Sequence, residues 1–312
     1  MDALRVQRLL GSTSPSLAVD TTPHHFSMAA LVALLTSAPG EAAMDEMLVS
    51  GLAAGNRILA FGFAETEKHP DAGVLSPSLR ATEDPEGVRV SGVTRTGGLG
   101  QEMDVLVTTV MAPRWDETGE EPALMLVPAE AEGLTVGGSG RDGERVTLDG
   151  VLLPPDLLLR DSSPDGQLDV ALTTGFLWLQ LLTTGSCLGA ASGLVERVLL
   201  EDRVPESDRI GLLVEIEGAM SAAEGVARRI DDGSPDESAL AHALHVRYHV
   251  QDCLARVVPR AVELLNGLGS TAPEEVDLFT GCVDGLALHP PARSRMTGAL
   301  SAHLAGGPLT IT

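Results

Sequence analysis

Positive charge is scarce in this chain. Twenty arginines and a single lysine, Lys68, stand against 44 acidic residues, which gives a formal net charge of −23. A chain with this charge repels nucleic acids and anionic membrane surfaces. The composition therefore predicts neither a nucleic-acid partner nor a membrane partner. A polyanionic substrate would need a local basic patch, and none stands out in the sequence.

Long hydrophobic runs and paired cysteines are lacking as well. The mostly apolar run Phe176–Leu182 is too short to cross a bilayer, and Met1–Leu10 is charged and lacks the apolar core of a signal peptide. Cys187, Cys253 and Cys282 lie far apart without C-x-x-C spacing. We therefore expect free thiols in a soluble, cytoplasmic protein whose core needs no disulfide or metal to fold.

The hydrophobic pattern divides the chain into three regions: a short helical segment at residues 1–55, a β-domain at 56–160 and a helical bundle at 161–312. In the middle region, segments of alternating apolar and polar residues are separated by Gly, Pro and Asp, a pattern that favours the short strands of a barrel or sandwich. In the last region apolar residues recur at helical spacing, which predicts an antiparallel bundle. The expected bundle helices are Val170–Leu200, Ile210–Ile230, Ser238–Leu268, Pro273–Asp284 and Ala292–Leu304.

Five stretches follow one another in a specific order: GNRILAFGFAETE, then RVSGVTRTGG, then ALMLVPAEAEGLTV with RVTLDGVLLPPDLLL, then CLGAASGLVERVLLEDR, and ELLNGLGS. In this order they resemble the acyl-CoA dehydrogenase superfamily, which includes the two-component flavin monooxygenases. The resemblance implies an α+β fold with an N-terminal helical segment about half the usual length, a middle β-barrel or sandwich, and a C-terminal bundle. It also implies a homodimer or larger oligomer formed through the bundle, or a hetero-oligomer with a longer homologue.

The stretches that hold flavin in this superfamily depart from its pattern. Arg95 and Thr96 stand near the place of the aromatic residue that stacks on the flavin, and the phosphate-binding box is reduced to Arg203 in RVPE. The carboxylate that removes the α-proton in dehydrogenases is absent, and LALHPPARSR stands in its place. Dehydrogenation needs that base. With aromatic residues at 3%, we expect no resident cofactor; if FAD or FMN does bind, Arg203 is the expected contact.

Three residues are candidates for catalysis. The resemblance places His289 where the monooxygenase branch carries a histidine that faces flavin and substrate, and it places His25, or its neighbour His24, on the opposite side of the cleft. Two histidines at one cavity could shuttle protons near neutral pH, although both could also serve only as turn or cap residues. Glu65, at the entry to the β-domain, is the third candidate.

Four residues are predicted to bind substrate: Arg95, Thr96, Trp178 and Arg293. Three further histidines, His242, His245 and His249, share one helix face, but no second ligand cluster accompanies them. No metal site is predicted.

Three functions are compatible with these features. The favoured hypothesis is a flavin-independent cyclase or isomerase of natural-product biosynthesis, which holds a large, hydrophobic, polyketide-like small molecule in the former flavin cleft. The first alternative is a monooxygenase that uses reduced flavin. The second is a non-catalytic partner subunit of a hetero-oligomeric acyl-CoA dehydrogenase.

Overall fold

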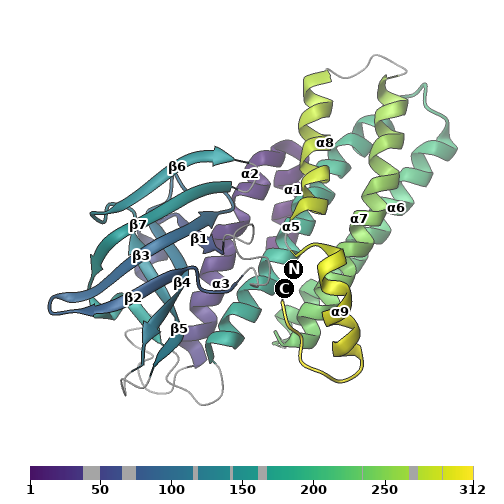
Figure 1. Cartoon of the computed structure of the whole chain (residues 1–312). Coiled ribbons are helices and arrows are strands. Elements are labelled where there is room, and N and C mark those ends of the chain that lie inside the picture. Colours follow the sequence, from purple (N-terminus) through teal and green to yellow (C-terminus); the bar gives the residue numbers. More distant parts are fainter. Residues whose placement is uncertain are drawn as a thin grey trace. The chain divides into compact units, whose positions relative to one another are not determined.

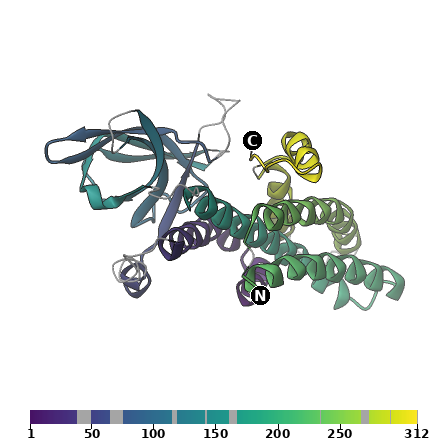
Figure 2. The ribbon, with the colours of Figure 1, turned by 90° about the horizontal axis from the view of Figure 1, so that it is seen from below.

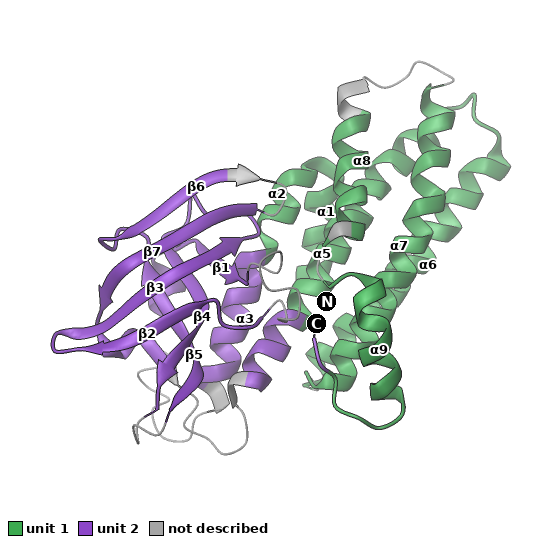
Figure 3. Cartoon of the chain, viewed as in Figure 1, with its two compact units in different colours: residues 1–22, 177–309 green, residues 23–176, 310–312 purple. Residues whose placement is uncertain are grey.

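The computed structural model describes residues 1–37, 50–64, 75–114, 119–140, 143–160, 167–233, 235–266, 273–289 and 291–311. Helices come first, strands follow, and helices end the chain (Figure 1). This order confirms the predicted α+β class. The contacts divide the chain into two compact units (Figure 3): Met1–Thr22 with Leu177–Leu309, here unit 1, and Pro23–Phe176 with Thr310–Thr312, here unit 2. The three-domain division at residues 55 and 160 stays a prediction.

Unit 2 is built on one eight-stranded sheet, whose strands curve round in Figure 2. The sheet has the order β6-β7-β3-β1-β4-β5-β8, and β2 pairs with both β3 and β4. Its pairs are antiparallel except that β1 and β2 run parallel to β4. The strands are β1 (Leu59–Phe63), β2 (Leu79–Asp84), β3 (Gly87–Thr96), β4 (Val105–Pro113), β5 (Glu120–Pro128), β6 (Leu134–Gly140), β7 (Gly143–Leu153) and β8 (Leu158–Arg160). Helix α3 (Thr22–Ser37) and the short 3-10 helix η1 (Pro155–Leu157) complete this part of the chain.

Side-chain alternation explains why these segments form a half-buried sheet. In β3, Val88 and Val90 are buried while Arg89 and Ser91 are exposed, as expected when successive side chains point to opposite faces. The buried members of the strands pack into one apolar cluster. Between β4 and β5, the Arg114 N–H donates to the Gly119 carbonyl over 2.9 Å and closes the connection, whose residues 115–118 lie outside the described part.

Unit 1 is helical. Its elements are α1 (Asp2–Thr13), α2 (Pro15–Asp20), most of α5 (Gln167–Leu199), α6 (Glu206–Asp231), α7 (Glu237–Asn266), α8 (Pro273–Leu288) and α9 (Arg293–Leu304). Helix α6 carries Glu206 and Asp208 in its first turn and Arg228 and Arg229 in its last, which complements the helix dipole at both ends. No helix within the described ranges is long and apolar enough to cross a membrane.

Helix α1 packs directly on α5 through two glycines. A β-carbon on Gly11 would lie 2.2 Å from the Ser186 carbonyl oxygen, and one on Gly189 would lie 2.2 Å from the Arg8 carbonyl oxygen. No side chain larger than hydrogen fits at either place. The buried amide of Gln7 donates to the Ser186 hydroxyl over 2.9 Å and so satisfies a polar pair inside this contact.

Candidate active site

A cavity of about 480 Å³ in unit 1 contains His289, and we call it the His289 cavity. Its volume lies in the range of small-molecule sites. Helix α8 supplies Leu278, Cys282 and Gly285, and His289 follows directly after it; the four residues recur every three or four positions and therefore share one face. Helices α2 and α5 also contribute to the lining, with Ser16, Val19, Asp20, Thr183 and Cys187.

His289 is held neutral at the wall of this cavity. It lies just after α8, where its N–H donates to the Gly285 carbonyl over 2.9 Å, and its Nε2 lies 3.5 Å from the Thr183 hydroxyl. Desolvation, with a smaller contribution from the nearby Arg247 cation, lowers the pKa of His289 to about 3. The side chain is half-buried, so what little solvent reaches the ring moderates this shift without reversing its direction.

A buried arginine positions His289. Arg247, in the middle of α7, is 1% exposed and donates to the Gln180 side-chain oxygen over 2.5 Å and to the Leu286 carbonyl over 3.0 Å. It also donates to the carbonyls of His289 and Pro291. A cation at the C-terminal end of α8 complements both the helix dipole and the carbonyls that the helix itself leaves unbonded. Desolvation nevertheless lowers the pKa of Arg247 to about 10, so the residue remains charged at neutral pH.

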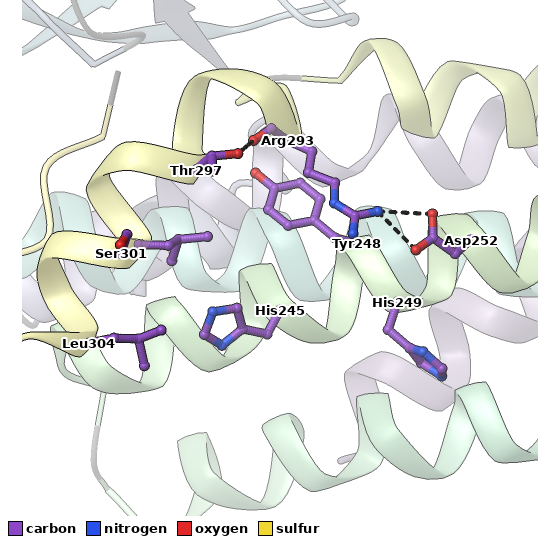
Figure 4. Close-up of a pocket in the computed structure, with 9 residues that line it drawn as sticks. His245, Tyr248, His249, Asp252, Arg293, Thr297, Ser301 and Leu304 are labelled. Carbon is purple, nitrogen blue, oxygen red and sulfur yellow. Dashed lines mark hydrogen bonds and ion pairs between the residues drawn. The ribbon is translucent and has the colours of Figure 1, made fainter.

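A second pocket, of about 470 Å³, lies between α7 and α9 (Figure 4), and we call it the α7–α9 pocket. Arg293, predicted to bind substrate, lies here, and its guanidinium contacts both carboxylate oxygens of Asp252 at 2.8 and 3.0 Å. The two side chains are 57% and 52% exposed. His245 and His249 line the same pocket. Within the described ranges, no three His, Cys, Asp or Glu residues are placed to hold a metal ion.

Unit 2 concentrates the few aromatic side chains of the protein. Four of the five phenylalanines form one cluster in which ring centroids lie 4.1 to 6.5 Å apart: Phe26, Phe61, Phe63 and Phe176. Phe63 is half-buried, and beside it the backbone of Gly97 is exposed. A β-carbon on Gly97 would lie 3.8 Å from the Phe63 ring. Although aromatic residues make up only 3% of the chain, four of their rings are thus gathered in one place.

The paired histidines also lie in unit 2, at the start of α3. His24 accepts the Leu59 N–H through its Nδ1 at 3.2 Å, so that nitrogen carries no proton. Burial lowers the pKa of both His24 and His25, and for His25 its neighbour adds to the effect. His24 therefore connects α3 to β1, while His25 remains a catalytic prediction. Glu65 lies outside the described residues.

The other predicted contacts have varied surroundings. Thr96 is fully buried, and its hydroxyl donates over 3.4 Å to the Glu144 carboxylate, which also accepts the Gly100 N–H at 2.5 Å. Arg95 on β3 and Trp178 on α5 are half-buried. Arg203 is exposed and forms a two-pronged ion pair with Glu201 at 2.8 and 2.9 Å. Their roles toward a substrate or cofactor stay predictions.

The sequence analysis missed Asp20, Thr183 and Arg247 as parts of the site. Thr183 contacts His289 and Asp20 lines the same cavity; both lie on helices far away in sequence, and no local motif marks them. A usable signal did exist on α8, because Cys282, Gly285 and His289 follow helical spacing and share a face.

Comparisons with known proteins give consistent results. No family model matches the chain. Isobutylamine N-hydroxylase of Streptomyces viridifaciens is 36% identical over 320 aligned residues, which cover 100% of this chain and 84% of that protein. The sequence similarity thus extends along the whole chain.

Among solved structures, FMN-bound TdsC of Paenibacillus sp. A11-2, a dibenzothiophene monooxygenase, superposes with a TM-score of 0.79 at 18% identity, covering 99% of this chain and 85% of that one. Butyryl-CoA dehydrogenase of Megasphaera elsdenii gives 0.76 at 16% identity, with 97% and 81% covered. Methanesulfinate monooxygenase MsuC of Pseudomonas fluorescens gives 0.71 at 17% identity, with 100% and 84% covered. At these identities the structures establish the fold, and they confirm the predicted resemblance. The chain belongs to the acyl-CoA dehydrogenase superfamily, in the flavin monooxygenase branch that contains isobutylamine N-hydroxylase.

Proposed function

We propose that this protein is a reduced-flavin-dependent monooxygenase that hydroxylates the nitrogen of a small aliphatic amine. The observation that carries the proposal is the 36% identity with isobutylamine N-hydroxylase over the whole chain. This relationship favours the monooxygenase alternative over the flavin-independent cyclase preferred in the sequence analysis. It also removes the support for the expectation that no cofactor binds.

The residues of unit 2 fit a flavin ring. A flat tricyclic ring needs an apolar or aromatic face and nearby backbone groups that can form hydrogen bonds. The half-buried Phe63 ring and the exposed Gly97 backbone provide both, and they are the residues that would hold the ring. When bound, reduced flavin activates dioxygen, so that one oxygen atom is transferred to the substrate and the other leaves as water.

The His289 cavity has the chemistry that an alkylamine requires. Asp20 attracts the ammonium form by charge, and Val19, Leu278 and Leu286 offer apolar contacts to a short alkyl chain. Transfer out of water favours the neutral amine, whose lone pair is then available for reaction. A neutral His289 accepts a hydrogen bond from the substrate N–H and orients that lone pair.

Reduced-flavin binding and oxygen transfer test the proposal together. The protein is titrated anaerobically with reduced FMN and reduced FAD, then mixed with isobutylamine and ¹⁸O₂, and the products are identified by mass spectrometry. We expect saturable binding of one flavin and a hydroxylamine that carries one labelled oxygen. Absence of both results would overturn the proposal. Light scattering on the same sample tests the predicted homodimer.

A matched pair of aspartate variants tests the assignment of the cavity. Under this proposal Asp20→Asn raises KM for the amine about tenfold or more, because one charge contact is lost, while kcat changes less. Asp252→Asn, in the α7–α9 pocket, leaves KM unchanged. Equal effects in the two variants would exclude the His289 cavity as the amine site.

A further inference from the structure

Two thiols meet in the wall of the His289 cavity. Cys187 on α5 and Cys282 on α8 are 95 residues apart in sequence, yet their sulfur atoms lie 3.9 Å apart. The Cys187 thiol also lies 3.3 Å from the Cys282 carbonyl oxygen. Both residues line the cavity; Cys282 is half-buried and open to a small solute that enters it, whereas Cys187 is buried behind it.

The two thiols differ in acidity, so that one of them forms the reactive thiolate more readily than the other. The hydrogen bond between them, followed by burial, raises the pKa of Cys187. The same bond lowers the pKa of Cys282, although burial and Asp20 oppose that effect. Cys282 is therefore the sulfur that more readily becomes a thiolate, and the thiolate is the nucleophile. The third cysteine provides contrast, since burial and a hydrogen bond to Glu215 raise the pKa of Cys253 to about 11.

Bond formation requires the sulfurs to approach from 3.9 Å to about 2.05 Å, and the helices differ in their freedom to move. Helix α5 is fixed beside Cys187, because β-carbons on Gly185 and Gly189 would lie 2.7 and 2.2 Å from atoms of α1. Helix α8 is not packed closely at Gly281 and Gly285, where an added β-carbon would meet nothing within 4 Å. Beside Cys282 the backbone of α8 is therefore free of close contacts at these glycines, although Phe279 of the same helix packs against Gly193 of α5.

We propose that Cys187 and Cys282 form a reversible disulfide when hydrogen peroxide enters the His289 cavity. The Cys282 thiolate attacks one peroxide oxygen, the O–O bond breaks, and the released hydroxide takes up a proton to give water. Cys187 then attacks the sulfur of the resulting Cys282 sulfenic acid, the S–O bond breaks, and a second water forms with the proton of Cys187. In total, two thiols lose two electrons and two protons, and one peroxide becomes two waters.

This disulfide would link α8 to α5 seven residues before His289. Because His289 and Cys282 share one face of α8, the bond restricts the wall that carries His289 and narrows the cavity. The inference does not depend on the proposed amine hydroxylation, since the peroxide can be supplied directly.

Peptide mapping tests the inference on the intact chain. Reduced wild-type protein is exposed to stoichiometric hydrogen peroxide, denatured, blocked with N-ethylmaleimide and digested. We expect an intact mass lower by two hydrogens before blocking, one peptide pair joined through Cys187 and Cys282, and full reversal by dithiothreitol. The Cys282 thiol should be lost at least about tenfold faster than the Cys253 thiol.

Cysteine variants separate a specific pair from general oxidation. Cys253→Ser should form the same linkage at the same rate. Cys187→Ser should accumulate oxygen on Cys282 instead of a disulfide. The proposal is overturned if wild-type Cys282 gains oxygen without forming the linked peptide, if the linkage joins two chains, or if all three thiols are oxidised equally fast. Wild-type mapping alone decides between these outcomes, so a poorly folded variant does not affect the test.

Discussion

Two pockets of nearly equal size, about 480 and 470 Å³, have very different environments. The His289 cavity is lined by a histidine that is kept neutral, and the backbone carbonyl of this histidine accepts a hydrogen bond from the buried Arg247. In the α7–α9 pocket, the ion pair between Arg293 and Asp252 is more than half exposed. Similar volumes therefore do not indicate similar capacity for chemistry, because solvent weakens the exposed ion pair of the second pocket, whereas the Arg247 cation beside His289 is buried.

The largest expected effect concerns Arg247. Arg247 donates hydrogen bonds to four oxygen atoms. The substitution Arg247→Met removes this cation and leaves buried acceptors such as the Gln180 side chain and the Leu286 carbonyl without their donor. We expect a loss of about 3 to 5 kcal/mol in the free energy of unfolding, measured by urea denaturation. A loss below about 1 kcal/mol would show that the two pockets differ less than their burial indicates.

The second effect concerns catalysis and depends on the proposed function. His289→Ala removes the hydrogen-bond acceptor at the cavity wall and should lower kcat/KM for the amine by about 100-fold, whereas His289→Gln should retain part of the activity. The matched control is His249→Gln, at the exposed α7–α9 pocket, which should leave kcat/KM unchanged. A similar loss of kcat/KM in His289→Ala and His249→Gln would contradict the assignment of the His289 cavity as the active site.

The third effect is a dependence of stability on pH. The pKa of His289 is about 3 in the folded protein and about 6.5 in an unfolded chain. Between these values the unfolded chain binds the extra proton, so the free energy of unfolding falls as pH decreases from about 6.5 toward 3, by up to about 1.4 kcal/mol per pH unit. In the His289→Gln variant the free energy of unfolding, measured by urea denaturation at pH 4 to 7, should fall less steeply as the pH decreases. Parallel curves for the variant and wild type would show that His289 does not titrate in this way.

The smallest effect is expected at the exposed ion pair. Arg293→Met breaks its contacts with Asp252, yet the free energy of unfolding should change by less than about 1 kcal/mol, and less still at high salt. A loss comparable to that of Arg247→Met would mean that the α7–α9 pocket is the better-organised site.

Periodic features of the fold could be predicted from the sequence. Helix α6 begins four residues before the predicted Ile210 and ends at Asp231, one residue after the predicted end, because its apolar spacing continues throughout. Two strands of the sheet have weak local signals: β2 is short and largely polar, and β6 contains the Gly-rich sequence VGGSG. Weak alternation and glycine give little local evidence of a strand.

Long-range contacts could not be predicted in the same way. Nothing local indicates that Cys187 meets Cys282, or that Arg247 lies buried against the end of α8, because both contacts depend on how helices distant in sequence pack together. The resemblance located His289, and three-dimensional packing determined its protonation.

The glycine contact between α1 and α5 has a practical consequence for dissection of the protein. Since the first 22 residues belong to the same compact unit as residues 177–309, the bundle is assembled from both extremes of the polypeptide. In a truncated protein that begins in the middle of α5, Gly185 and Gly189 of that helix would be exposed to water. The Ser186 hydroxyl would also lose its hydrogen-bond donor, Gln7. A fragment that contains the helical unit should therefore retain residues 1–22, either by fusion or by circular permutation.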